Sequence, residues 1–486
     1  MRRGIEKESL RVRSDGALAT TPHSRLLGAA LTHPHITTDF SESQLELITS
    51  PHTTPEACLA ELTEIHQVVY RAIREELLWV ASMPCGLPED DAIPIGQYGS
   101  SNIGRMKTVY RVGLAHRYGR RMQMISGIHY NFSVPGQSNE SYFALIRNFR
   151  RHSWLPILLF GASPAVCPSF VEGRSHKLVP FTPGTLHLPH ATSLRMGQLG
   201  YQSEAQVSLA VSYNSLESYA ASLHEALTVP YPPYERIGVR HGDDYRQLAT
   251  SLLQIENEFY SPIRAKRTIR RGERPLHALR ERGVEYVEVR LMDLDAFEPV
   301  GIAAATMRFL DVFLLHCLLS DSPPDTPAEL EALARNKLRG AERGREPGLR
   351  LERGSKEVTL AEWGAEILEG CAPVAAALDA ALGGTAHREA HSHATSVLKN
   401  PARTPSARVL EEIKARHGGS YTRFVVAHSQ AHADTLRALP LAFPTEARFA
   451  RMMGESLREQ RETEAADSLD FETYRRKYLS PEQLRV

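Results

Sequence analysis

The feature that most constrains the fold is a set of short segments in which charged residues alternate with aliphatic ones. Side chains alternate between the two faces of a β-strand, so residues two apart share a face. In residues 5–10, Glu6 and Glu8 therefore lie side by side. Two neighbouring carboxylates repel each other unless a cation lies between them. The pattern predicts strands with an apolar face packed on helices and a polar face lining a site.

Four later segments repeat this pattern. Their polar residues are Asp39 in residues 36–40, Glu46 in 44–48, His129 and Asn131 in 126–133, and Tyr286, Glu288 and Arg290 in 284–290. Oxygen ligands with one imidazole suit Mg²⁺ or Mn²⁺, and these segments hold no cysteine, which zinc would favour. For any single glutamate a solvated acidic face is the simpler interpretation. Because the pattern recurs, it indicates a magnesium site. Protein-bound magnesium usually keeps substrate phosphate oxygens among its ligands, so the site in turn indicates nucleotide chemistry.

Secondary-structure patterns predict an α+β protein. Strand-like and helical runs alternate over residues 4–290, and helical runs rich in Ala, Leu, Glu and Arg follow residue 297. We expect a single unit over residues 1–486, with a catalytic sheet and covering helices in 1–316 and a mainly helical wrap in 317–486. Within it we predict helices at 55–78 and 142–149, an exposed connection at 320–353, and helix breaks at Gly383-Gly384 and Gly418-Gly419.

Composition favours a small-molecule partner in the cytoplasm. The 57 basic residues balance 57 acidic ones, so no net field would draw the chain to nucleic acid or to an anionic membrane. The five cysteines are widely spaced and lack a CxxC pair, which argues against a disulfide framework and a structural zinc site and fits a reducing compartment. The first residues lack an apolar signal core, and no apolar run is long enough to span a bilayer.

Several familiar motifs are missing or ambiguous. The nearest match to a Walker A motif, residues 99–106, lacks its lysine and its hydroxyl ligand, and the sequence has neither a GxGxxG nor a GxSxG motif. A basic run that includes Arg264, Lys266 and Arg267 could grip a triphosphate or lie exposed, and both interpretations stay open. The three histidines of residues 387–393 are interpreted as a solvated helix face rather than a metal site.

Taken together, these segments resemble the proteobacterial class of glutamate-cysteine ligases. The matching stretches are GIEKESLRV, LTHPHITTDFSESQLELIT, SMPCG, QYGSSNIGRMKTVYRVGL, RYGRRMQMISGIHYNFS, LFGASPAVC, ATSLRMGQLGY, LQIENEFYSPIRAKR and GVEYVEVRLMDL. The similarity runs through about residue 315 and is patchier beyond it. It implies a fold like that of glutamine synthetase and its carboxylate-amine ligase relatives: a curved, mostly antiparallel sheet whose concave face holds the active site, backed by helices.

The resemblance also implies roles for individual residues. Metal ligands would be Glu6, Glu8, Asp39, Glu46, His129 and Glu288, and Glu288 and Arg290 would be catalytic. The cysteine pocket would comprise Phe40, Tyr110, Leu114, Gln123, Arg195, Tyr201 and Tyr260, with Arg195 holding the cysteine carboxylate through its planar guanidinium. Arg290 and Arg111 would face the glutamate carboxylates. The basic residues Arg264, Lys266 and Arg267 are the candidates for nucleotide binding.

The activity that the resemblance implies is ATP-dependent ligation of L-glutamate to L-cysteine, the first step of glutathione biosynthesis. Mg²⁺, with Mn²⁺ as an alternative, would be the cofactor, and we expect a monomer. Family members usually carry a short helical segment before the first strand, whereas three residues precede Gly4 here, so the resemblance implies that this strand lacks that support. Three alternatives stay open: a related ligase acting on another amino-acid pair, a magnesium-dependent phosphohydrolase, and a noncatalytic nucleotide-binding protein.

Overall fold

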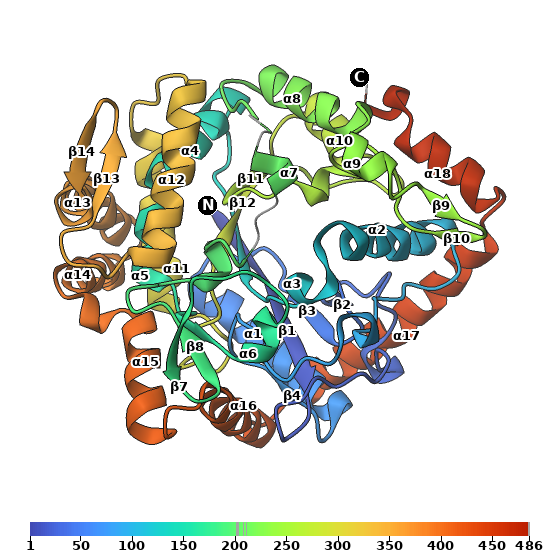
Figure 1. Cartoon of the computed structure of the whole chain (residues 1–486), viewed down its shortest axis with the longest axis horizontal. Coiled ribbons are helices and arrows are strands. Elements are labelled where there is room, and N and C mark those ends of the chain that lie inside the picture. The colour runs from blue at the N-terminus through green and yellow to red at the C-terminus, as the bar shows by residue number, and fades with distance from the viewer. Residues whose placement is uncertain (201–203, 208, 210, 485–486) are drawn as a thin grey trace.

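The computed structural model describes residues 1–200, 204–207, 209 and 211–484. In this part of the chain, seven strands form the central sheet, and all neighbouring pairs in it run antiparallel. The strand order is β11-β12-β5-β1-β3-β2, with β4 paired to the end of β1 (Figure 1). The strands are β1 (Arg2–Val12), β2 (Ile36–Thr38), β3 (Gln44–Ile48), β4 (Leu77–Leu78), β5 (Ile128–Ser133), β11 (Ile263–Lys266) and β12 (Tyr286–Met292).

Helices surround this sheet and dominate the C-terminal part of the chain (Figure 1). They are α1 (Pro55–Ile73), α2 (Asn102–Tyr118), α3 (Arg120–Gln123), α4 (Asn139–His152), α5 (Trp154–Phe160), α6 (Pro168–Val171), α7 (Glu204–Val207), α8 (Leu216–Thr228), α9 (Pro232–Glu235), α10 (Pro275–Arg282), α11 (Ala304–Leu319), α12 (Pro327–Arg343), α13 (Leu360–Leu382), α14 (Ala386–Lys399), α15 (Pro405–Arg416), α16 (Tyr421–Ala438), α17 (Phe443–Ala465) and α18 (Phe471–Leu479). Smaller strands are β6 (Ala165–Val166), β7 (Val179–Thr182), β8 (Thr185–His187), β9 (Arg240–His241), β10 (Asp244–Tyr245), β13 (Arg350–Arg353) and β14 (Lys356–Thr359). The predicted α+β class with an antiparallel sheet is confirmed.

The apolar face of the sheet packs on helices, as the alternation predicts. Ile5, Tyr130 and Val289 lie opposite one another on β1, β5 and β12 and are completely buried. Helices α1, α4 and α5 contact these strands, and α11 packs on α1 and α4. Each fully buried aliphatic side chain contributes roughly 1.5–3 kcal/mol of hydrophobic stabilisation. The opposite face of the same strands is therefore free to carry charge.

A buried ion pair fixes the first strand to the helical layer. Arg3 on β1 binds Asp311 on α11 through two contacts, Nη2 to Oδ2 at 2.8 Å and Nε to Oδ1 at 3.2 Å. The hydroxyl of Tyr130 on β5 donates to the same carboxylate at 2.7 Å. Three elements that are distant in sequence, β1, β5 and α11, thus share one charged network, which holds β1 against the helical layer.

Lys7 provides a second contact between β1 and the helices. It lies between Glu6 and Glu8 but points to the helical side, where its Nζ is 2.8 Å from Nε2 of the buried His66 on α1. The Nδ1 atom of His66 lies 2.7 Å from the carbonyl of Leu62, so Nδ1 carries the proton and Nε2 accepts from Lys7. Burial lowers the pKa of Lys7 to about 7.

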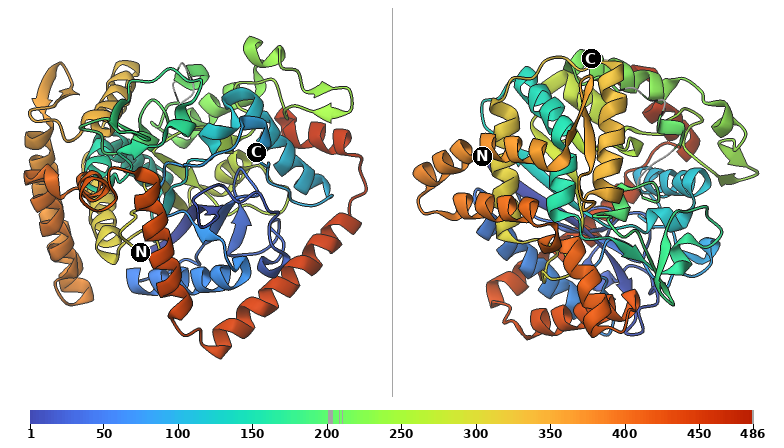
Figure 2. Two further views of the ribbon diagram at one scale, coloured as in Figure 1. Left: turned by 60° about the horizontal axis from the view of Figure 1, so that its bottom comes forward. Right: turned by 60° about the vertical axis from the view of Figure 1, so that its left-hand side comes forward.

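The C-terminal helices wrap around the sheet domain (Figure 2). Helices α13 and α14 pack on α11, α16 packs on α1 and β4, and α18 reaches α2 on the other side of the molecule. Positive φ angles at Gly383, Gly384, Gly418 and Gly419 confirm the predicted helix breaks. The division at residue 316 stays a prediction.

Two predicted boundaries need correction. Residues 320–353 are not simply an exposed connection, because they contain α12, which packs on α5, and the strand β13. Thr326 caps α12 by accepting from the backbone N–H of Glu329, and Pro327 follows at the first helical position, a strong helix start signal. The predicted helix at 55–78 ends at Ile73, where Arg74 adopts a positive φ, so that residues 77–78 can form β4.

The cysteines also differ in part from expectation. Cys85 and Cys167, 82 residues apart in the sequence, form a disulfide, although the spacing predicted no disulfide framework. Cys58, Cys317 and Cys371 are buried free thiols. Only the fold brings the paired cysteines together, and their spacing carries no local signal.

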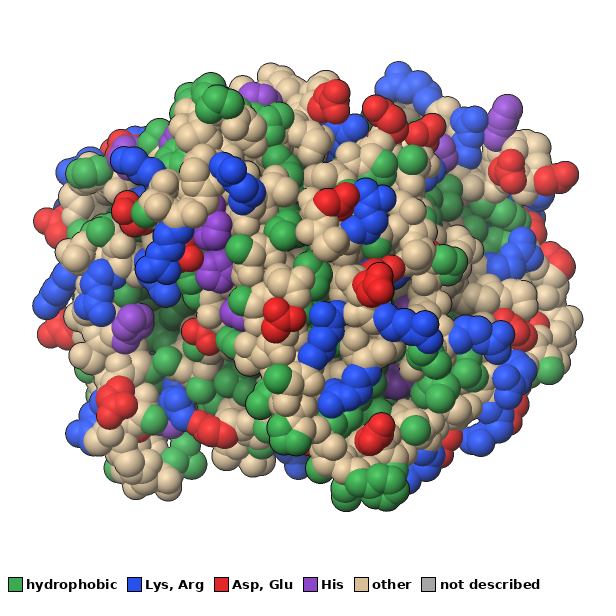
Figure 3. Space-filling view, turned by 90° about the horizontal axis from the view of Figure 1, so that it is seen from below, with side chains coloured by type: hydrophobic (Ala, Val, Ile, Leu, Met, Phe, Trp, Pro, Cys, Tyr) green, Lys and Arg blue, Asp and Glu red, His purple; other side chains and the backbone are tan. Residues whose placement is uncertain are grey.

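The outer surface carries no dominant charge on the face shown in Figure 3, where basic and acidic side chains are interspersed. Across the described part of the chain, no helix is both long enough and apolar enough to cross a bilayer.

We predict that Asp311→Ala strongly destabilises the protein. Removing one partner of a buried pair leaves the Arg3 guanidinium uncompensated, which costs about 3–5 kcal/mol of unfolding free energy. Urea titration followed by circular dichroism measures this loss. Asp15→Ala is the control, because Asp15 forms an exposed pair with Arg13, and it should leave the unfolding midpoint almost unchanged. Equal stability of Asp311→Ala and wild type would contradict the role of this network.

Candidate active site

Strand register gathers the predicted polar residues on one face of the sheet. Glu6 on β1 lies opposite His129 on β5, and Glu8 lies opposite Glu46 on β3. Glu288 on β12 lies opposite Asn131 on β5 and, on its other side, opposite Arg264 on β11. Residues from five strands therefore meet, because antiparallel pairing aligns their polar positions.

Distances show that these side chains form one cluster. Nδ1 of His129 lies 3.2 Å from Oε2 of Glu6 and 3.8 Å from Oε1 of Glu288, and its Nε2 lies 3.8 Å from Oε1 of Glu8. The ligand atoms of Glu6, His129 and Glu288 all lie within 4.8 Å of one another. Asn131 donates to Oε1 of Glu6 at 2.9 Å and orients it. The cluster therefore presents carboxylate oxygens and one imidazole toward a common point.

Glu288 is also surrounded by cations. Its carboxylate lies 3.1 Å from Nζ of Lys266 and 3.0 Å from Nη1 of Arg290. Burial alone would raise the pKa of Glu288, but Lys266 and Arg290 hold that pKa well below its usual range. Glu288 is thus ionised, and the two cations beside it can contact an anionic ligand at the same place.

The remaining carboxylates are crowded. Burial and the charge of Asp39 raise the pKa of Glu8 to about 8, although the backbone N–H of Gly127 donates to it at 2.7 Å. Burial and the charges of Glu6 and Asp39 raise the pKa of Glu46 well above its usual range. Such a group retains protons until a cation replaces them. The donor set and its excess negative charge fit Mg²⁺, which prefers carboxylate oxygens.

The cluster lies in a cavity of about 340 Å³. One face of α2 lines this cavity with residues at helical spacing: Ile103, Met106, Lys107, Tyr110, Arg111 and Leu114. Ser101 caps α2 by accepting from the backbone N–H of Gly104, and Arg111 approaches Asp39, with Nη2 3.9 Å from Oδ1. The cavity therefore has an acidic face on the sheet and a mixed apolar and basic face on α2.

Most predicted site residues line this cavity. They are Glu6, Glu8, Asp39, Phe40, Glu46, Tyr110, Arg111, Leu114, Gln123, His129, Tyr260, Arg264, Lys266, Glu288 and Arg290. Gln123 donates to the hydroxyl of Tyr260 at 3.3 Å, which links two of the predicted cysteine-pocket residues.

Three predicted site residues are not among those that line the cavity. Arg195 is buried and does not line the cavity. Its Nη2 donates to the carbonyl of Arg290 at 2.8 Å, and its charge lies close enough to Glu8 to offset part of the rise in the pKa of that carboxyl. Arg267 does not line this cavity but an adjoining one, donates to the carbonyl of Arg282 and pairs with Glu285. Tyr201 lies outside the described residues.

The sequence patterns missed several lining residues. Tyr474 and Tyr478, one helical turn apart on α18, border the cavity together with Glu256 and Asn257. The guanidinium of Arg274 lies 5.0 Å from the centre of the Tyr478 ring and binds Glu256 at 2.8 Å. No local motif marks the two tyrosines, because their role depends on the last helix returning to the sheet domain.

The histidines of residues 387–393 lie on α14, where the sequence predicted a solvated helix face. That prediction is wrong for His387. His387 is buried, with Nδ1 3.0 Å from Asp379, and His391 lies 2.7 Å from the carbonyl of Leu368 through Nε2. His393 is exposed as expected.

Comparison with known proteins agrees with this geometry. The sequence profile of the glutamate-cysteine ligase family matches residues 1–339. The chain is 48% identical to the glutamate-cysteine ligase of Alcanivorax borkumensis, over 99% of this chain and 95% of that protein. It is also 48% identical to the enzyme of Pseudomonas fluorescens, over 97% and 92% of the two chains.

Solved structures show the same relationship. The crystal structure of glutamate-cysteine ligase from Francisella tularensis in complex with AMP superposes with a TM-score of 0.94 and 35% identity, covering 98% of this chain and 97% of that one. A bifunctional glutathione synthetase from Pasteurella multocida matches with a TM-score of 0.71 and 28% identity, over 93% of this chain and 56% of that one. On fold, length and sequence, the chain belongs to the glutamate-cysteine ligase family.

Proposed function

We propose that this chain joins the γ-carboxylate of L-glutamate to the amine of L-cysteine with ATP, the first step of glutathione biosynthesis. The observation that carries the proposal is the convergence of Glu6, Glu8, His129 and Glu288 beside Lys266 and Arg290 in one cavity. A carboxylate is a poor acyl donor, because oxide would have to leave. Transfer of the γ-phosphoryl group of ATP to the glutamate γ-carboxylate gives γ-glutamyl phosphate, from which phosphate can leave.

The acidic cluster would hold the metal. Glu6, Glu8, Asp39, Glu46, His129 and Glu288 are the candidate ligands for Mg²⁺ or Mn²⁺. When bound, the ions neutralise charge on the phosphate oxygens during transfer. Lys266 and Arg264 flank Glu288, with Arg264 Nη1 4.0 Å from its Oε2, so both are placed to contact the triphosphate. Arg267 points elsewhere, which leaves Arg264 and Lys266 as the better nucleotide-binding candidates.

Arginines on opposite walls would position glutamate. Arg290 extends from β12 beside Glu288, and Arg111 extends from α2 beside Asp39. A guanidinium recognises a carboxylate through paired hydrogen bonds. Holding the substrate from both sides would keep its γ-carboxylate in line with the terminal phosphate, and such positioning supplies a large part of the rate enhancement in ligation reactions.

The cysteine pocket would be the less charged part of the cavity. Phe40, Tyr110 and Leu114 provide apolar surface, and Gln123 and Tyr260 form a hydrogen-bonded pair. Cysteine's amine must attack the acyl carbon as the neutral base, and an enclosed pocket favours that form and excludes water. Arg195 and Tyr201 remain part of this proposal, as do a cytoplasmic location and a monomeric state.

The direct test is to identify the product. Purified protein with ATP, Mg²⁺, L-glutamate and L-cysteine should yield γ-glutamylcysteine by mass spectrometry, with one ADP released per product. A product with another amine from a panel of amino acids, and none with cysteine, would indicate a related ligase. Phosphate release without either amino acid would indicate a phosphohydrolase.

We predict that Glu288→Gln lowers kcat by roughly 10²–10³-fold, the effect of removing one charge-stabilising group at a reacting centre. The matched control is Glu285→Gln, three residues earlier and exposed, which should retain wild-type turnover. Steady-state kinetics at saturating Mg²⁺ distinguish them, with circular dichroism to verify folding. Wild-type turnover and ordinary magnesium dependence in Glu288→Gln would contradict the role of this residue.

A second prediction concerns Arg195. If its guanidinium reaches the cysteine carboxylate in the liganded enzyme, Arg195→Ala should raise the KM for cysteine by tenfold or more and the KM for ATP much less. Arg195→Lys keeps the charge but loses the planar fork, and it should recover only part of the cysteine affinity. Equal changes in the KM values for cysteine and ATP would exclude this role and leave Arg195 as a support for β12.

A further inference from the structure

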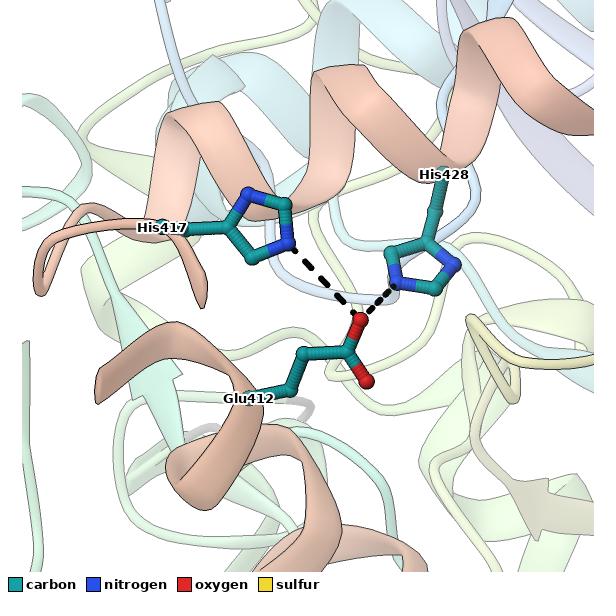
Figure 4. A group of neighbouring side chains, drawn as sticks. All are labelled: Glu412, His417 and His428. Carbon is teal, nitrogen blue, oxygen red and sulfur yellow. Dashed lines mark hydrogen bonds and ion pairs between the residues drawn. The ribbon is translucent and has the colours of Figure 1, made fainter. Parts of the chain in front are cut away.

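A second cluster of metal-ligating side chains lies in the C-terminal wrap, apart from the active-site cavity. It consists of Glu412 on α15, His417 in the turn after α15, and His428 on α16 (Figure 4). None of the three lines the cavity described above. Both imidazole rings point their Nε2 atoms toward the same carboxylate oxygen, Oε1 of Glu412.

The spacing of the three atoms matches a metal site. Nε2 of His428 lies 2.9 Å and Nε2 of His417 lies 3.7 Å from Oε1 of Glu412, and all three ligand atoms lie within 4.8 Å of one another. Ligands at roughly 2.0–2.1 Å from a tetrahedral zinc ion are about 3.4 Å apart. One observed separation is shorter than that value and the other is longer, and the two imidazole nitrogens lie within 4.8 Å of each other.

The backbone holds this arrangement in place. The positive φ angles of Gly418 and Gly419 turn the chain sharply after His417, and the N–H of Gly419 donates to the carbonyl of Ile413 at 2.8 Å. The carbonyl of Gly419 in turn accepts from the hydroxyl of Thr185 at 2.8 Å. His417 is therefore presented by a fixed turn, and a preorganised ligand set binds a metal at a lower entropic cost.

Electrostatics also favour a cation here. Glu412 lies near the C-terminal end of α15, where the helix dipole disfavours a carboxylate and favours a cation. The nearby Arg416 is largely exposed, and its Nη1 is 3.9 Å from Oε1 of Glu412. This exposed ion pair is weak, so Arg416 competes little with a metal ion for the Glu412 carboxylate.

We propose that Glu412, His417 and His428 form a binding site for a transition-metal ion of the zinc class, with a fourth position open to water. Two imidazoles and one carboxylate suit zinc and its neighbours, whereas magnesium prefers a shell made mostly of oxygens. The ligands are half-buried, with side chains 15% to 19% exposed, so an ion can enter from solvent. The site differs in chemistry from the oxygen-rich cluster of the active site.

The bound ion would link α15 to α16. Helix α16 packs on α1 and on β4, the strand that pairs with the end of β1. An ion that binds only the folded chain stabilises it by mass action. The site would therefore act as a structural link in the wrap and would not take part in the ligation reaction.

The test is a calorimetric titration of the whole enzyme with Zn²⁺ in saturating Mg²⁺, comparing wild type with His417→Gln and His428→Gln. We expect each variant to lose one zinc equivalent or to bind it at least tenfold more weakly, while ligase turnover with Mg²⁺ stays at the wild-type level. His393→Gln is the matched control, since His393 is an exposed histidine of the same wrap, and it should bind zinc like wild type.

Equal zinc affinity and stoichiometry in wild type and both variants would overturn the proposal. His428 also packs on Phe424 and Phe297, so His428→Gln could lose stability for another reason. The decisive variant is then His417→Gln, examined by zinc titration and by replacing zinc with Co²⁺. The visible absorption of Co²⁺ bound to wild type should be absent or altered in His417→Gln, and an identical spectrum would also overturn the proposal.

Discussion

Repulsion between carboxylates on one face of an antiparallel sheet is the constraint on which the rest of this structure depends. Register places Glu6, Glu8 and Glu46 on neighbouring strands, and their partial or full burial weakens the screening of their charges by water. Protonation relieves part of this repulsion, as the raised pKa values of Glu8 and Glu46 indicate. Divalent cations carrying phosphate would relieve it more completely, so the repulsion that raises these pKa values would also favour metal binding.

The opposite face of the sheet supports that arrangement. β1 carries the acidic pair on its inner face and Arg3 and Lys7 on its outer face, where Asp311 and His66 hold them. These contacts fix the strand by its charged as well as its apolar side chains. Because charged and apolar contacts on its outer face hold this strand, the carboxylates of its inner face stay close together despite their repulsion.

The sequence predicted the features that depend on the spacing of neighbouring residues, namely the strands and their polar faces. The alternation in residues 44–48 and 284–290 predicted both the strands and the side chains that share a face, because a strand pattern determines which side chains lie together. Residues that reach the site through long-range packing had no such signal. Tyr474 and Tyr478 border the cavity only because α18 returns to α2, and Cys85 meets Cys167 only in the folded chain. The close spacing of the α14 histidines is of the kind found in metal sites. The cluster at Glu412 has no such local signal, because it joins residues from two helices and a turn.

The central claim is that these acids converge on divalent cations that hold the terminal phosphate of a nucleotide. The most direct measurement is anomalous diffraction from crystals of the protein with Mn²⁺ and a nonhydrolysable ATP analogue. The account predicts manganese peaks bonded to oxygens of Glu6, Glu8 or Glu288 and bridging to the terminal phosphate. Nucleotide bound with its phosphates away from this cluster, and no manganese among the carboxylates, would contradict it.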